Sequence, residues 1–334
     1  MTVSRRALRS PRGFIGRLRP EVEDDLAMWS YAVRRVVTLI PVLFGVSFLV
    51  FAGMYIIPGD AVDMMLAETG ATAEDLARLR NQLGLDDPFM VQYGRFLGQM
   101  VRGDLGESIV TGRDVKQQIR NQLPATIELT MAALAIAFLF GVPLGIVSAI
   151  KRGSWIDAVS MMIALIGVSM PNFWLGLLFI MGFSLGLGWF PAAGTGGLDH
   201  LVMPAMTLGF SGIAVIARVS RSSLLEVMNT DFMRTARSKG LREHSVVIKH
   251  GMRNAMASVL TIVGLQFGAL LGGSVVVETV FGRQGIGFLA ANAIQRGDFT
   301  LVQATVMLAS LAFVLVNLLV DFSYSLLDPR IRYT

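Results

Sequence analysis

The sequence predicts an all-α membrane protein built as a bundle of six membrane-spanning helices. The chain of 334 residues is 53% hydrophobic and only 16% charged, with a mean hydropathy of +0.60, which is far more apolar than a soluble domain. Its apolar residues gather in runs near the ~20 residues with which a helix crosses the bilayer. These runs lack the alternation of barrel strands, so helices must satisfy their backbone groups in lipid.

The predicted spans are, in chain order, about 36–57, 129–150, 158–187, 201–222, 257–278 and 301–322. The first follows eight arginines and ends at Pro58-Gly59-Asp60 instead of a small-residue cleavage site, so we interpret it as a retained span. The third is too long for one upright span and too short for two. Pro171 near its middle predicts a bend.

The distribution of positive charge predicts the orientation of the spans, because Lys and Arg favour the cytoplasmic side. With a cytoplasmic N-terminus, twenty of the 29 basic residues fall in inside segments. An even number of crossings must then separate Lys151 from Arg218, so 158–187 is expected to be one long bent span. Both termini are expected in the cytoplasm.

The outside segment 58–124 is expected to form a small helical cap on the bundle. Short helices are predicted over Ala73–Leu83 and Phe89–Val101, with Asp87-Pro88 as the break between them. The apolar residues of the second helix should pack against the spans, with substrate binding as the less favoured interpretation.

The inside segment 223–256 is expected to present a short helix, with body Phe232–Lys239, outside the lipid. Thr230 or Asp231 is placed to cap it, and Gly240 supplies a left-handed stop. A second helix is predicted from Arg242 to Ala255. The basic residues could hold the short helix on lipid headgroups as a plain connector, or the helix could be a rigid handle for a cytosolic partner.

Charged residues within the spans are few. Four acidic residues are predicted at span ends, where interfacial water can reach them: Glu128, Asp157, Glu278 and Asp321. A secondary carrier would place carboxylates at the midplane, so this class is disfavoured, although it stays open as an alternative. The chain has no cysteine, and its three histidines lie outside the spans. The sequence therefore predicts no metal site and no catalytic site of an intramembrane enzyme.

Sequence motifs add a resemblance. At Asp231-Phe-Met-Arg-Thr-Ala-Arg-Ser-Lys-Gly-Leu241, followed by His250-Gly-Met-Arg-Asn-Ala255, the chain resembles the dipeptide, oligopeptide and nickel permease family of ABC importers. Further matches in family order are Ile57-Pro-Gly-Asp60, Leu83-Gly-Leu-Asp86, Gly103-Asp-Leu-Gly-Glu-Ser108, Leu123-Pro-Ala-Thr-Ile-Glu-Leu129, Val277-Glu-Thr-Val-Phe-Gly282 and Asp328-Pro-Arg-Ile-Arg-Tyr333. Order and spacing together carry far more weight than one motif.

The resemblance implies the type I ABC importer permease fold over 31–334, with 1–30 as a cytoplasmic N-terminal extension. It also implies a bacterial plasma (inner) membrane location and a transporter subunit, not an enzyme. The implied partners are a second homologous permease, two ATP-binding subunits and an extracytoplasmic peptide-binding protein, with lipid around the bundle and no nucleic acid. The chain lacks the G-x-x-x-x-G-K-[ST] pattern, so ATP and Mg are expected on the partner subunits.

In that family the short inside helix, the coupling helix of the EAA loop, docks on the ATPase. The resemblance assigns this role to Asp231, Arg234, Thr235, Ala236, Arg237, Ser238, Lys239, Gly240 and Leu241. It assigns contact with the binding protein to Phe281, Gly282, Arg283, Gln284, Gly285, Gln295, Arg296 and Asp298, although this loop could equally be a connector that closes the outer gate. Four polar span residues are candidates for pore lining or for helix–helix bonding: Ser169, Asn172, Gln266 and Asn317.

Substrate identity is the least determined property. Import of di- or oligopeptides is favoured by frequency within the family, while nickel and glutathione importers share most of these motifs and remain alternatives.

Overall fold

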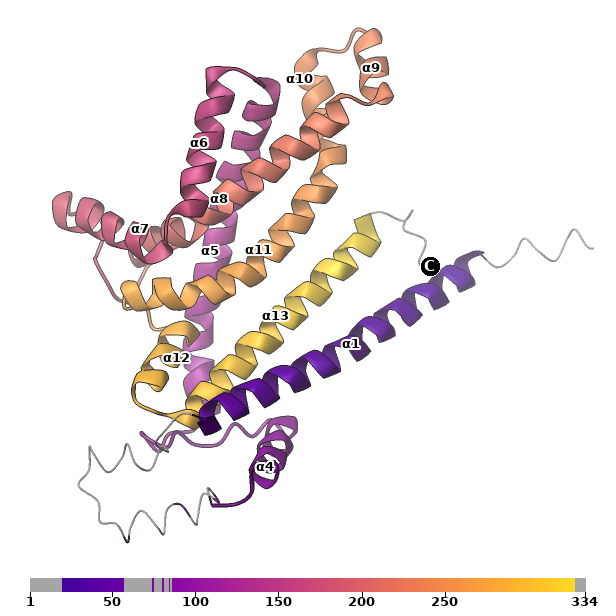
Figure 1. Cartoon of the computed structure of the whole chain (residues 1–334). Coiled ribbons are helices and arrows are strands. Elements are labelled where there is room, and N and C mark those ends of the chain that lie inside the picture. Colours follow the sequence, from indigo (N-terminus) through magenta and orange to yellow (C-terminus); the bar gives the residue numbers. More distant parts are fainter. Residues whose placement is uncertain (1–19, 57–73, 75–79, 81–83, 85, 328–334) are drawn as a thin grey trace, which may run out of the picture.

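The computed structural model describes residues 20–56, 74, 80, 84 and 86–327 (Figure 1). Its elements are helical: α1 Pro20–Ile56, α4 Phe89–Val101, α5 Val115–Ile150, α6 Trp155–Ser169, α7 Asn172–Phe179, η1 Ile180–Gly186, α8 Leu198–Met228, α9 Asp231–Ser238, α10 Glu243–Ser245, η2 Val246–Met252, α11 Arg253–Val280, α12 Ile286–Gln295 and α13 Phe299–Leu327. Here η1 and η2 are π-helical. The predicted all-α fold is confirmed.

Several predictions fall outside the described residues. They concern the Pro58-Gly59-Asp60 stop, most of the helix Ala73–Leu83 and the C-terminal motif Asp328–Tyr333. α1 begins at Pro20 and continues without a break past residue 30. The division into 1–30 and 31–334 therefore stays a prediction.

Within the described residues, five helices are long and apolar enough to cross a membrane, and a sixth span results if α6 and α7–η1 count as one. These two halves meet at 105°, a much sharper turn than the predicted bend. Met170, which precedes Pro171, has ψ 125°, because a proline excludes the residue before it from the helical region. The helix therefore ends there and a new one starts.

α5 begins much earlier than the predicted second span. Asp114 caps its first turn by accepting a hydrogen bond from the Gln117 N–H at 2.6 Å. Val115 and Ile119 in this first part are buried against α12 and α13. The last ten residues of the predicted outside segment are thus part of a 36-residue helix.

The centre of the bundle is the contact between α5 and α8, which glycines make possible. A Cβ on Gly145 would lie 2.5 Å from the Ala217 carbonyl oxygen, and one on Gly209 would lie 2.7 Å from the Ala133 carbonyl oxygen. α6 lies on one side of this pair and α11 on another, while α1 runs along α13 at the edge of the bundle (Figure 1). The two backbones therefore touch directly.

The cap helix α4 has the predicted bounds and packs on the first span. Tyr93 and Phe96 are buried in a cluster with Phe51 of α1, and Phe89 stacks beside them. The Tyr93 hydroxyl lies 2.9 Å from the Ser47 hydroxyl. The expectation that these side chains pack against the spans is confirmed.

Candidate functional site

The predicted short inside helix exists as α9, two residues after α8 ends. Gly240 has φ +74°, and its N–H donates to the Arg237 carbonyl oxygen at 2.9 Å, so the predicted glycine stop is confirmed. The predicted side-chain cap is wrong. The Thr230 hydroxyl donates back to the Val227 carbonyl oxygen at 2.6 Å and leaves the first turn of α9 without a side-chain acceptor.

One face of α9 is buried against the second arm of the loop. Met233 is fully buried and Ala236 is 8% exposed, and both pack on Val246 of η2. A Cβ on Gly251 would lie 3.0 Å from the Leu224 side chain and 3.2 Å from the Met233 side chain. This glycine therefore lets η2, α8 and α9 meet closely, and α9 is held against both arms.

Arg237 fixes the end of α9. Its Nη2 lies 2.9 Å from Glu243 Oε1, and its Nη1 donates to the Met228 carbonyl oxygen at 3.4 Å. The hydrogen bond to Glu243 raises the pKa of the Arg237 guanidinium, which stays charged. The side chain thus joins the end of α8, α9 and α10.

The other face of α9 and the turn that follows it are exposed and carry most of the predicted coupling residues. Asp231, Arg234, Thr235, Ser238, Lys239, Gly240 and Leu241 are exposed. Ala236 and Arg237 instead face inward or pack within the loop, so they build the helix's support. Sequence reasoning missed Phe232, an aromatic side chain 45% exposed on this face. The sequence signal that could have identified Phe232 was its position directly before Met233. Because neighbouring residues of a helix point in different directions, burial of Met233 leaves Phe232 outside the buried face.

The basic segments lie at one end of the bundle. Figure 1 shows α9 and α10 at the same end as the turn that joins α5 to α6, while α12 and α4 lie at the opposite end. The turn carries Lys151 and Arg152, and the α9 loop carries Arg234 and Lys239. This arrangement agrees with the charge argument for a single cytoplasmic end.

The outer loop Phe281–Phe299 is more enclosed than predicted. Phe281, Arg283 and Asp298 are at most 2% exposed, so they cannot present their side chains to a binding protein in this conformation. Arg283 pairs with Glu128 at 2.5 Å, and Asp298 accepts a hydrogen bond from Ser108. These residues hold the loop on α5 and on the segment before it, because a buried charge needs a partner.

The remaining members of the predicted contact loop differ in exposure. Gln284, Gln295 and Arg296 are exposed, Gly282 is partly exposed and Gly285 is buried. Among the predicted contact residues, Gln284, Gln295 and Arg296 are therefore the side chains that a partner could touch.

Glu278 is fully buried, so the prediction that interfacial water reaches it is wrong. Its carboxylate accepts from the Thr126 hydroxyl at 2.7 Å and from the Phe288 N–H at 3.0 Å. The start of α12 folds over it because Gly285 and Gly287 leave room where a Cβ would collide with the carboxylate or with α11. Asp157 is also buried, at 6% exposure. Glu128 is exposed, as predicted.

The four candidate pore residues lie on four different helices. The side chain of Asn172 lies beside Gly273 of α11, close enough to contact a Cβ added at that glycine. The side chain of Gln266 lies beside Gly212 of α8 in the same way. Ser169 is exposed at the break before α7, and Asn317 is half-buried on α13. Pore lining by these residues stays a prediction.

Comparison with known proteins identifies the family. Residues 141–333 match the family described as binding-protein-dependent transport system inner membrane component, and residues 28–130 match its N-terminal region. The glutathione transport system permease protein GsiC of Escherichia coli K12 is 44% identical over 306 residues, which cover 92% of this chain and all of that protein. GsiC of Salmonella paratyphi A matches to the same extent.

Solved structures show the same fold. The methionine ABC transporter MetNI in an inward-facing conformation matches with a TM-score of 0.56 at 19% identity, over 64% of this chain and 97% of that chain. An amino acid ABC transporter crystallised with histidines gives a TM-score of 0.50 at 17% identity, over 63% and 94%. The family works with ATP-binding subunits and a substrate-binding protein. This chain belongs to the binding-protein-dependent inner membrane component family and is the permease subunit of a bacterial ABC importer, not an enzyme.

Proposed function

We propose that this chain is the pore subunit of an ATP-driven importer of small peptides, with glutathione-like tripeptides as its preferred class. The observation that carries this proposal is the 44% identity to a glutathione permease over that protein's entire length. Di- and oligopeptides share with glutathione an amide backbone and terminal charges. A nickel ion shares neither of these features, so it is the less favoured substrate.

The proposed site of energy coupling is the exposed face of α9. Met233 and Ala236 fix the helix to η2, and Arg237 fixes it to α10 and to the end of α8. Phe232 and Leu241 supply apolar surface next to the charges of Arg234 and Lys239, which suits docking in a groove of a folded partner. We assign that partner as an ATP-binding subunit, with one such subunit for each of two homologous permeases.

Transport then proceeds by alternating access. ATP and Mg bind to the partner subunits, whose closure displaces α9. Because α9 is packed on both α8 and η2, which continues into α11, its displacement moves two spans together. The extracytoplasmic binding protein delivers the peptide at the opposite end, where Gln284, Gln295 and Arg296 are exposed. The N- and C-termini stay on the cytoplasmic side.

Uptake by the purified complex in proteoliposomes tests the substrate class. We expect labelled glutathione to accumulate when ATP and the binding protein are both supplied, and not when either is omitted. An unlabelled dipeptide should compete more weakly, and Ni²⁺ should not compete. Uptake of Ni²⁺ in place of peptide, or uptake that follows an ion gradient without ATP, would contradict the proposal.

The docking role of α9 is tested by Phe232→Asp, which places a charge on the exposed face without touching the buried face. The variant should insert and fold normally, lose co-purification with the ATP-binding subunit and lose ATP-driven uptake. Lys249→Ala is the matched control, because Lys249 is exposed on η2 but does not lie on α9. Normal uptake by Phe232→Asp would refute the docking role.

A further inference from the structure

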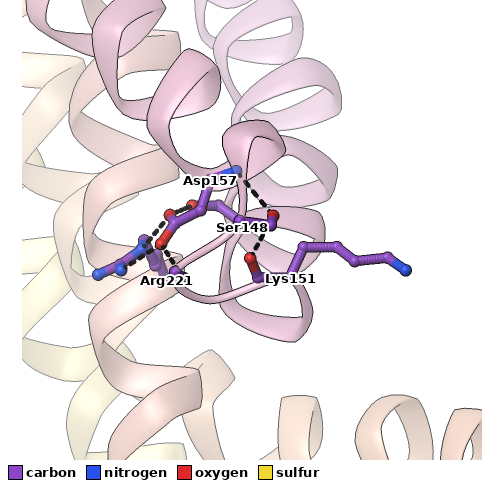
Figure 2. A network of polar contacts seen from close by, with 6 residues as sticks. Ser148, Lys151, Asp157 and Arg221 are labelled. Carbon is purple, nitrogen blue, oxygen red and sulfur yellow. Dashed lines mark hydrogen bonds and ion pairs between the residues drawn. The ribbon is translucent and has the colours of Figure 1, made fainter.

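Three helices meet at one buried carboxylate beside the turn that joins α5 to α6 (Figure 2). Asp157 of α6 accepts from Arg221 of α8 through two hydrogen bonds, Nε to Oδ1 and Nη2 to Oδ2, each 2.8 Å long. The Ser148 hydroxyl of α5 donates to Oδ1 at 2.5 Å. We call Ser148, Asp157 and Arg221 the three-helix cluster.

The turn between α5 and α6 completes the coordination of this carboxylate. Gly153, with φ +76°, donates its N–H to Asp157 Oδ2 at 3.0 Å. The Ser154 hydroxyl accepts from the Asp157 N–H at 3.4 Å and donates to the Lys151 carbonyl oxygen. Each carboxylate oxygen therefore accepts two hydrogen bonds, and the side chain is 9% exposed.

Burial of such an ion pair is a weak source of stability, because desolvation of the charges offsets their attraction. A bidentate contact of this kind does fix the relative orientation of the two helices that carry it. The guanidinium and carboxylate groups must be coplanar, with each N–H aligned on one oxygen. The geometry of the three-helix cluster thus points to a role in positioning helices.

The rest of the α6–α8 contact contains no ion pair among the described residues and is made of closely packed small side chains. α6 turns small residues toward its neighbours, with Ser160, Ala164 and Gly167 buried. A Cβ on Gly167 would lie 3.0 Å from the Ala214 Cβ. Small side chains permit close approach of the two helices. The directional bonds of Asp157 add a fixed register between α6 and α8 at the end of the contact next to the α5–α6 turn.

The three-helix cluster also lies close to the end of α8 that leads into α9. Arg221 lies seven residues, about 10 Å of helical rise, before Met228 at the end of α8, and α9 begins three residues later at Asp231. The α5–α6 turn and α9 lie at the same end of the bundle (Figure 1). A displacement of α9 would therefore move the part of α8 that carries Arg221, the ion-pair partner of Asp157.

We propose that Asp157 and Arg221 are positioning residues for energy coupling, which make α6 move with the α5–α8 pair as one unit when α9 is displaced. The inference rests on the coupling role proposed for α9. It predicts that the ion pair matters for how much transport each ATP drives, and not chiefly for whether the protein folds.

The double variant Asp157→Leu with Arg221→Met separates these two roles. Apolar replacement of both partners removes the directional contact without leaving a buried unpaired charge, so the complex should assemble. Its thermal stability should fall only by the loss of the acceptor for the Ser148 hydroxyl and the Gly153 N–H. ATP hydrolysis should continue, while uptake per ATP hydrolysed should fall about tenfold, within the usual range of coupling effects. Wild-type uptake per ATP in this variant would overturn the proposal.

A distance measurement tests the same claim in the otherwise unchanged protein. The chain has no cysteine, so spin labels can be placed at Met162→Cys on α6 and Ser222→Cys on α8, both exposed positions. In the complete complex, with the other subunits made cysteine-free, the label-to-label distance should be the same with and without ATP and vanadate. Arrest of ATP hydrolysis confirms that the trapped state has formed.

The outcomes are distinguishable from failure of the proposed function. A distance that changes between the two states without the double substitution would refute the single unit, even if the double variant failed to assemble. Uncoupling by Phe232→Asp together with wild-type coupling in the double variant would leave the role of α9 standing and remove this inference alone.

Discussion

The Thr126 hydroxyl uses both of its hydrogen-bonding roles to hold the outer end of α5 to α11 and α12. It donates to Glu278 Oε1 at 2.7 Å and accepts from the Ile286 N–H at 2.8 Å. Thr126 and Glu278 are both buried, so water cannot replace either bond. A buried polar group left without a partner costs far more than an average hydrogen bond contributes.

Thr126→Val is expected to lower the free energy of unfolding by about 1–3 kcal/mol, because it leaves the Ile286 N–H without its acceptor and Glu278 without one donor. Thermal unfolding of the purified complex in detergent measures the effect. Thr126→Ser keeps the hydroxyl and is the control, with a melting temperature close to wild type. Equal stability of the Val and Ser variants would show that this hydroxyl is dispensable.

Burial of individual side chains was the property that the sequence predicted least well. Glu278 and Arg283 lie near the end of a span in the sequence, where charges usually meet water, yet both are fully buried. The enclosing contacts come from Thr126 and Glu128, about 150 residues earlier in the chain. Periodicity within one helix carries no information about such distant partners.

The α5–α8 pair shows how glycines determine the position of whole helices. Gly145 and Gly209 face the partner helix, and a methyl group at either position would meet backbone atoms that cannot rotate away. Contact between backbones is a common way to join helices in lipid, where the hydrophobic effect does not drive them together.

Gly145→Ala is expected to destabilise the protein by about 1–3 kcal/mol, because the added Cβ would lie 2.5 Å from the Ala217 carbonyl oxygen and 2.6 Å from the Ser220 Cβ. The matched control is Gly272→Ala on α11, where an added Cβ meets nothing within 4 Å. Thermal unfolding of the two variants compares them directly. Loss of stability in both, or in neither, would contradict the packing argument.

Among the elements, α9 and α4 were predicted well because both are bounded by local signals. Gly240 ends α9, and Pro88 immediately precedes α4. The break between α6 and α7 was predicted only as a bend. Pro171 predicts an interruption of the helix. The angle of 105° between the two halves depends on the helices that each half packs against, which for α7 are α8 and α11.

Orientation belongs to the whole molecule, and the absence of native cysteine makes it measurable. Single cysteines at Arg234 on α9 and at Arg152 on the α5–α6 turn should react with an impermeant maleimide only after the membrane is opened. Single cysteines at Arg296 and at Leu198 should react in intact spheroplasts. Arg296 directly follows α12, which lies at the opposite end from α9 (Figure 1), Leu198 is the first residue of α8, whose last residue is next to α9, and both are exposed.

The same experiment decides the span count. Reaction of Leu198→Cys from outside and of Arg152→Cys from inside requires α6 and α7–η1 to cross the membrane once between them. Reaction of both from the same side would make the bent pair a re-entrant loop and would leave five spans. Labelling of Arg234→Cys in intact cells would also remove the basis for docking a cytosolic ATPase.

The seam between α5 and α8 has an electrical consequence. Where two backbones touch, no continuous chain of water molecules can form between them. Protons need such a hydrogen-bonded chain to cross the membrane. An importer that changes conformation many times must not discharge the membrane potential as it does so. The glycines of this contact would then prevent proton leakage between α5 and α8 while other surfaces of the protein open and close.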